Sequence, residues 1–176
     1  MNLKHAAPRK KKWPLYCFYA AVAMLLLAGV LYLVFCQNIN SEFGHNEEYF
    51  GEQFDELYAL SGIDEDVFSP ILAQGLSALQ TIGTQEEISA HGVFSRYGVD
   101  LSSYPEAHSV SAKAEALAAS IDGNSGYIWV AYVQEVYDAQ GELVSASGNE
   151  DARILSRWSV EKLDGAWTVT EIKEKP

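Results

Sequence analysis

The sequence predicts an α+β protein with one amino-terminal membrane-spanning helix. An uncharged apolar run lies near the amino terminus, helical periodicity with capping residues follows it, and period-two alternation begins near residue 109 and continues to the end. Helices that precede strands in separate runs are typical of helices packed on an antiparallel sheet. We therefore expect about three helices on a curved antiparallel meander of four to five strands.

The apolar run covers residues 15–36 and predicts a transmembrane anchor. As a helix it would be about 33 Å long, which is enough to cross a hydrocarbon core of about 30 Å. A cleavable signal peptide has a shorter apolar stretch that ends in small residues, whereas Leu33 and Phe35 are bulky. Phe35 also argues against lipid attachment at Cys36, because small residues precede the cysteine of a bacterial lipoprotein. We expect an uncleaved anchor.

Charge on either side of the run predicts its orientation. Residues 1–14 contain five cations and no carboxylate, and basic residues beside a span are retained in the cytoplasm. We expect a basic cytoplasmic tail at residues 1–14, a single pass through the cell membrane, and residues 37–176 outside the cytoplasm. The cations of the tail are Lys4, Arg9, Lys10, Lys11 and Lys12.

The rest of the chain is strongly acidic. Residues 37–176 keep 7 of the 12 Lys and Arg residues and all 24 Asp and Glu residues, for a net charge of −17. Such a domain repels phosphate backbones, so we expect no nucleic-acid partner. A solvated acidic surface is the expected use of these carboxylates, ahead of a dedicated site for a cation or a basic partner. Most of the remaining cations lie in or beside the last two predicted strands: Arg153, Arg157, Lys162, Lys173 and Lys175.

Cysteine usage adds an expectation about the source. Cys17 and Cys36 lie at the two ends of the apolar run, so residues 37–176 cannot form a disulfide within themselves. This part of the chain also contains no Asn-x-Ser/Thr glycosylation site. The two features together predict a bacterial cell-envelope protein rather than one from a eukaryotic secretory route.

Residues 37–46 are polar with little periodicity and predict a short stalk, which leaves residues 47–176 as the extracytoplasmic domain. Three helices are expected between the stalk and the sheet. Each begins at a residue that can cap or start a helix and ends at a glycine. Their expected limits are Asn46 to Gly62, Ser69 to Gly83, and Thr84 to Gly98. The third begins with a capping box, Thr-Gln-Glu-Glu at residues 84–87.

The strands are predicted by alternation. Residues 109–119 contain strong helix formers but also alternate like a strand, and the turn after them favours a hairpin strand over a helix. Residues 127–137 begin apolar on both faces, which predicts a central strand with something packed on each side. A shorter strand is expected near residues 142–147.

The last hairpin is predicted in most detail, because Asp164 and Gly165 form a type I′ turn signal. A two-residue loop makes paired residue numbers sum to 329. The predicted pairs are Val160 with Val169, Lys162 with Trp167, and Trp158 with Glu171. Trp158, Val160, Trp167, Val169 and Ile154 are then expected on the core face, and the other face is expected to be largely wet.

The segment RWSVEKLDGAWTV at residues 157–169 looks like the closing hairpin of NTF2-like and cystatin-like extracytoplasmic domains. The resemblance covers roughly residues 110–174. It implies helices on a curved sheet and a cavity between the two, where ketosteroid-isomerase-like members use a carboxylate base and a tyrosine donor. No motif carries those roles to particular residues here.

Cavity-lining candidates by position are Tyr97, Trp129 and Tyr132, with Asp100 or His91 as a titratable group. Aromatic residues at such spacing are more often core. The histidines are scattered, the domain has no cysteine, and no nucleophile or phosphate-binding motif occurs. We therefore expect no catalytic residues, no metal and no cofactor.

The remaining interpretation is a non-enzymatic interaction or assembly domain. A short stalk would concentrate such a domain at the outer membrane face for a protein partner. The alternative is a small-ligand pocket or an isomerase-type activity within the same fold.

Overall fold

The computed structural model describes residues 13–59 and 64–175, and the chain divides into two units, Met1–Asn40 and Ser41–Pro176. The predicted basic tail up to residue 12 lies outside the described residues. So does the predicted end of the first domain helix at Ser61 and Gly62.

Helix α1 spans Trp13–Phe43 and contains the whole apolar run. Within the described residues it is the one helix long and apolar enough to cross a membrane, and its most apolar window is exposed throughout. The helix does not end with the apolar run. Residues 37–43, predicted as an irregular stalk, are helical, and the 3₁₀ helix η1 (Gly44–Asn46) follows. Phe43 is fully buried in the second unit, so ordered structure begins earlier than Asn46.

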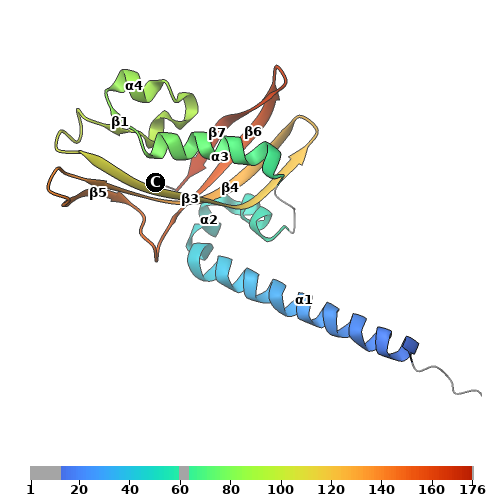
Figure 1. Ribbon diagram of the computed structural model, residues 1–176. Coiled ribbons are helices and arrows are strands. Elements are labelled where there is room, and N and C mark those ends of the chain that lie inside the picture. Colours follow the sequence, from blue (N-terminus) through green and yellow to red (C-terminus); the bar gives the residue numbers. More distant parts are fainter. Residues whose placement is uncertain (1–12, 60–63, 176) are drawn as a thin grey trace, which may run out of the picture. The chain divides into compact units, whose positions relative to one another are not determined.

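The second unit is built on a five-stranded antiparallel sheet (Figure 1). Its central strand β4 pairs with β3 along one edge, and on the other edge with β6 through residues 125–132 and with β5 through residues 134–137. Strand β7 pairs with the far side of β6. The α+β class and the predicted strands, including the ambiguous segment 109–119, are confirmed. The strands are β3 (Ser109–Asp122), β4 (Ser125–Tyr137), β5 (Leu143–Ser147), β6 (Ile154–Leu163) and β7 (Ala166–Glu174).

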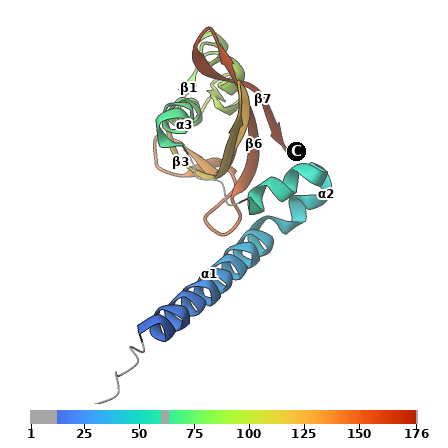
Figure 2. The same ribbon diagram turned by 90° about the vertical axis from the view of Figure 1, so that its right-hand side faces the viewer.

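Helical segments cover both faces of this sheet, as Figure 2 shows with α3 on one side and α2 on the other. The side of α3 also carries a short parallel pair, β1 (Ile82–Gly83) with β2 (Val99–Asp100). The first predicted domain helix therefore lies on the face opposite to the other two. The segments are α2 (Glu47–Phe50), η2 (Gly51–Tyr58), α3 (Glu65–Leu79), α4 (Gln85–Ser89) and η3 (Gly92–Tyr97).

Strand β4 is apolar on both faces because each face has its own layer to contact. Ile128 and Val130 belong to the core cluster beneath α3, and both are fully buried. Trp129 points to the other side, where its ring lies 4.7 Å from that of Phe50 in α2. Trp129 is fully buried as well. The prediction of a central strand covered on both sides is confirmed.

Helix boundaries differ from the predicted ones. Helix α3 begins at Glu65 rather than Ser69 and ends at Leu79, and it contains Pro70 without a break. A proline within the first turns removes one intrahelical hydrogen bond, which the burial of the apolar face outweighs. The helix also packs closely, since a Cβ at Gly75 would collide with the ring of Trp158.

Glycines in the left-handed region shorten the other two predicted helices. Gly51 has φ +59° and separates α2 from η2, and Gly92 has φ +60° just after α4. The predicted capping box is confirmed: the backbone N–H of Thr84 donates to Glu87 at 2.7 Å, and Thr84 Oγ1 accepts the N–H of Glu87. Because glycine adopts this conformation at little cost, the chain turns where a longer helix was expected.

The final hairpin follows the predicted register near its turn and departs from it farther away. Val160 pairs with Val169 and Lys162 with Trp167, as predicted. Trp158 pairs with Ile172 instead of Glu171, because a bulge shifts the register between Ser159 and Val160. A bulge adds one residue to a strand and reverses the faces of those beyond it. Ile172 consequently packs against the core cluster.

Candidate functional site

Two of the predicted cavity residues, Tyr97 and Tyr132, meet inside the unit. Tyr97 ends η3, Tyr132 lies in β4, and their ring centroids are 5.2 Å apart. Both hydroxyls reach the carboxylate of Glu174 in β7. Tyr97 Oη donates to it at 2.5 Å, and Tyr132 Oη at 3.5 Å. We call these three residues the tyrosine–glutamate cluster.

The surroundings of the cluster satisfy its polar atoms. Trp158 Nε1 donates to the Tyr97 hydroxyl at 2.9 Å, and Ser156 Oγ lies 3.1 Å from the same hydroxyl. Arg96 forms an ion pair with Glu174 at 3.2 Å, although the Glu174 side chain is only 8% exposed. Among the described residues, no buried side-chain nitrogen or oxygen lacks a hydrogen-bond partner.

The environment keeps both phenols protonated. Burial is the main cause that raises the pKa of Tyr97 and of Tyr132 above the usual 10.0, and the negative charge of Glu174 raises both further. A phenol with a raised pKa donates hydrogen bonds and is a poor base. In the tyrosine–glutamate cluster two phenol donors therefore contact one carboxylate, Glu174, and that carboxylate is already paired with Arg96.

Trp129, the third predicted cavity residue, lies on the opposite face of the sheet. Its Nε1 donates to Glu56 of η2 at 2.9 Å. Glu56 also accepts two hydrogen bonds from Arg157, from Nε at 2.7 Å and from Nη2 at 2.9 Å. The structure therefore brings Tyr97 and Tyr132 together and separates Trp129 from them.

The two titratable candidates also lie apart from the cluster. Asp100 in β2 accepts the backbone N–H of Ser102 at 2.8 Å, which is a local turn contact. His91 Nε2 lies 2.9 Å from Thr81 Oγ1, just before η3. In the described contacts Asp100 stabilises the turn after β2, and His91 connects the segments on either side of α4.

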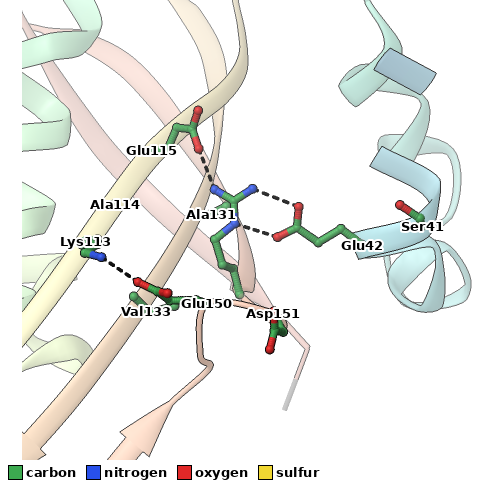
Figure 3. A pocket seen from close by; sticks show the side chains of 10 residues that line it. Ser41, Glu42, Lys113, Ala114, Glu115, Ala131, Val133, Glu150 and Asp151 are labelled. Carbon is green, nitrogen blue, oxygen red and sulfur yellow. Dashed lines mark hydrogen bonds and ion pairs between the residues drawn. The ribbon is translucent and has the colours of Figure 1, made fainter. Parts of the chain in front are cut away.

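A second site lies on the face opposite α3 and was not predicted. It is an open basin of about 690 Å³, with Ala131 and Val133 of β4 among its lining residues (Figure 3). We call it the charged basin. Its charged residues are Glu42, Lys113, Glu115, Glu150, Asp151 and Arg153.

Arg153 is the central contact of the charged basin. Its guanidinium donates to both oxygens of Glu42, from Nε at 2.6 Å and from Nη2 at 2.9 Å, and its Nη1 donates to Glu115 at 2.6 Å. It also lies over the ring of Phe43, 5.6 Å from the centroid. The hydrogen bond to Glu42 is the main cause that raises the pKa of Arg153, and the hydrogen bond to Glu115 and the charges of both carboxylates raise it further. Figure 3 shows Glu42 and Glu115 pointing toward this centre from two different elements.

The outer part of the basin is more loosely held. Lys113 and Glu150 form an ion pair at 2.9 Å, with side chains 73% and 83% exposed. Four carboxylates face two cations in the basin, so its chemistry favours a cationic or hydrogen-bond-donating group over an anion. Within the described part of the chain, no group of three or more His, Cys, Asp or Glu side chains could hold a metal ion.

Sequence reasoning missed the basin because Glu42 was assigned to the stalk. One signal was present: Arg153 and Arg157 are among very few cations in an acidic domain. Each of them binds a carboxylate that lies more than 100 positions earlier in the chain. Nothing local in the sequence identifies which carboxylate that is.

Fold and sites together define an α+β domain that follows an apolar helix, with a closed interior cluster and an open charged basin. No protein-family model matches the chain, and no curated protein matches it in sequence. Proposals about its function therefore depend on the geometry described above.

Loss of the Arg153 guanidinium, which donates hydrogen bonds to Glu42 and Glu115, should destabilise the domain. In Arg153→Gln, Glu42 and Glu115 lose their shared cation, and we expect the free energy of unfolding to fall by about 1–2 kcal/mol, since the pair is only partly buried and solvent screens it. Urea unfolding of the full-length protein in detergent, followed by tryptophan fluorescence, measures this. Glu150→Gln is the matched control, because it removes the solvated ion pair with Lys113 and should change the stability far less. Equal losses in the two variants would contradict the assignment.

The tyrosine–glutamate cluster predicts a loss of stability at high pH. In the unfolded chain both phenols lose a proton near the usual pKa of 10.0, whereas the folded chain retains them because their pKa values are raised. The stabilisation is therefore complete below about pH 10 and falls as the pH rises above it.

Replacement of one phenol tests this linkage. Tyr132→Phe should make the decline above about pH 10 shallower by up to ~1.4 kcal/mol per pH unit. The measurement is urea unfolding between about pH 8 and pH 11.5, a range that brackets the ordinary phenol pKa. Tyr104→Phe changes an exposed tyrosine and serves as the control. An unchanged slope in Tyr132→Phe would refute the linkage.

Proposed function

We propose that this chain is a membrane-anchored, non-enzymatic interaction or assembly protein of a bacterial cell envelope. The observation that carries the proposal is the contrast between its two sites. The polar atoms of the tyrosine–glutamate cluster are satisfied by one another and by Arg96, Ser156 and Trp158, whereas the charged basin is open and keeps exposed charges. A domain with such a distribution presents its chemistry at the surface, as an interaction domain does.

The apolar helix supports anchoring. Its exposed apolar surface is unfavourable in water and suits a bilayer. The basic residues before it support an amino terminus in the cytoplasm and a domain outside the cell membrane. Glu42 follows closely on Cys36 in the sequence, and the intervening chain spans at most about 22 Å. An anchor that precedes the domain so closely in the sequence would hold it at the membrane, where anchoring raises the effective concentration of a partner.

We further propose an NTF2-like relationship for the second unit. Support comes from the Trp-bearing hairpin that packs beneath α3 and from the tyrosines on that side of the sheet. In ketosteroid-isomerase-like members a carboxylate and a tyrosine serve an open cavity. Here Glu174 already binds two tyrosines and Arg96.

A small-ligand or isomerase-type function is the second candidate. One observation favours it, namely a nearly buried carboxylate beside two phenol donors. A ligand would have to displace the hydrogen bonds within the cluster in order to reach Glu174. This cost favours the interaction domain.

Topology can be measured by cysteine labelling. In a Cys17→Ser, Cys36→Ser background, Gln140→Cys introduces a thiol at an exposed turn. A membrane-impermeant maleimide should label it in intact cells. Lys4→Cys, in the predicted cytoplasmic tail, should be labelled only after permeabilisation. Protection of Gln140→Cys in intact cells would overturn the orientation.

Interaction can be tested by cross-linking the full-length protein in its native membrane, followed by affinity purification. We expect a stoichiometric partner in repeated experiments, either another protein or a second copy. Glu150→Lys, in the basin, should lower the yield of a partner that binds there. Glu86→Lys, on exposed α4, is the matched charge control. Recovery of the monomer alone in every repeat would refute the proposed function.

A further inference from the structure

Strand β3 is a long outer edge of the sheet. It pairs with β4 on one side only, and the regular part of that pairing covers residues 109–116 before a bulge at residue 117. Among the described residues, no backbone hydrogen bond reaches the outer side of residues 109–116. An edge of this kind can pair with a strand from another chain.

The outer edges formed by β7 and β5 are partly occupied or irregular. On β7, Arg96 of η3 donates to the carbonyl of Ile172 at 3.1 Å and so occupies one outward-facing acceptor. Strand β5 is five residues long, and a register shift interrupts its pairing with β4. The edge of β3 therefore offers the longest accessible run of backbone groups in the described part of the domain.

Side chains of β3 differ between its two faces. Ala112, Ala114 and Ala116 lie on the core side and are partly buried there. Lys113 and Glu115 point to the opposite face, into the charged basin, with side chains 73% and 65% exposed. The strand thus combines small residues on one face with one cation and one anion, two positions apart, on the other.

This pattern is self-complementary in one register. In an antiparallel pair related by a two-fold axis, opposed residues share a face, so their numbers must add to an even sum. A sum of 228 places Lys113 opposite Glu115 twice, with Ala114 on the axis. A sum of 226 places Lys113 opposite Lys113, and 230 places Glu115 opposite Glu115. Like charges directly opposed are unfavourable, so the charges favour the register in which paired residue numbers add to 228.

We propose that a second copy of this chain docks through β3, antiparallel and centred on Ala114, so that two five-stranded sheets join into one. This inference rests on the proposed function and names the partner. The continuous pairing covers residues 112–116, and the bulge at residue 117 ends it on each side. Main-chain hydrogen bonds supply the attachment, and the Lys113–Glu115 pairs set its register.

The dimer also joins the two charged basins. Within one copy, Glu115 contacts Arg153 and Lys113 contacts Glu150. Across the axis, Glu115 of one copy would reach Lys113 of the other. The result is a chain of alternating charges that runs from Arg153 of one copy to Glu150 of the second.

Charge reversal tests the register. Lys113→Glu and Glu115→Lys should each raise the dimer dissociation constant about tenfold, because two attractive cross-strand pairs become repulsive. The double variant Lys113→Glu/Glu115→Lys should return the constant to within roughly threefold of the original. The measurement is sedimentation equilibrium of the full-length protein in detergent, with circular dichroism as a check on folding.

The double variant separates contacts between copies from contacts within one copy. With both charges reversed, the new carboxylate at position 113 faces Glu150 and the new ammonium at position 115 faces Arg153, so the pairs within a copy stay broken. Recovery of the dimer can then come only from pairing between copies. A mixture of the two single variants should likewise form mixed dimers, because one copy supplies two carboxylates and the other two lysines.

A cysteine on the axis gives an independent readout in the native membrane. In the Cys17→Ser, Cys36→Ser background, Ala114→Cys should form a disulfide-linked dimer on mild oxidation. Thr168→Cys, on an exposed position of β7, should not. Equal cross-linking at both positions, or none at residue 114, would overturn the β3 dimer.

The outcomes distinguish this inference from the proposed function. Suppose that sedimentation finds only monomer at all concentrations and that native cross-linking recovers a different protein. These results together refute the dimer and leave the proposed interaction function in place. Failure of the double variant to recover the dimer refutes the register. Recovery of the monomer alone in both experiments refutes both.

Discussion

The burial of β4 on both faces is the constraint on which the rest of the second unit depends. A strand with Ile128 and Val130 on one face and Trp129 on the other needs an apolar layer on each side. Helix α3 and η3 supply one layer, and Gln134 fixes both of them by donating to the carbonyls of Leu79 and Tyr97 at 2.6 and 2.8 Å. Segments α2 and η2 supply the other. Residues after the apolar helix are consequently part of the fold and do not act as a spacer.

The second layer adds charged contacts to its buried apolar residues, which explains an unusual feature of the composition. The acidic segment that contains Glu42 and Glu56 lies against strands that carry most of the domain's few cations. Arg153 and Arg157 each make a two-pronged contact with one of these carboxylates, and Lys173 donates to Gln53 at 2.7 Å. With these cations engaged internally, the solvent-facing surface is left predominantly negative. Bidentate arginine contacts favour one geometry, so they also define how the layer sits on the sheet.

Local patterns in the sequence predicted what depends on local forces: the apolar helix, the capping box at Thr84, the strands, and the hairpin register beside Asp164. The opposite placement of Trp129 and Tyr132 could also have been predicted, because they lie three positions apart in one strand and so face opposite ways. The role of Glu174 could not, since the register shift that turns it inward depends on tertiary packing. The Glu42–Arg153 contact joins distant segments and leaves no local trace. Sequence reasoning therefore reached the fold class and one pair of interior residues, and it missed the charged basin.

Because of the bulge in the last hairpin, β7 should tolerate the loss of one residue better than the gain of one. Thr170 is the additional residue, since Val160 pairs with Val169 and Ser159 with Glu171. A strand without Thr170 could pair continuously and still place Ile172 opposite Trp158, with Glu174 inside. A strand longer by one residue would need a second bulge, or else it would turn Lys173 toward the aromatic interior. Natural variation in this strand should therefore include the loss of one residue beside Thr170, whereas insertions should be confined to the turns.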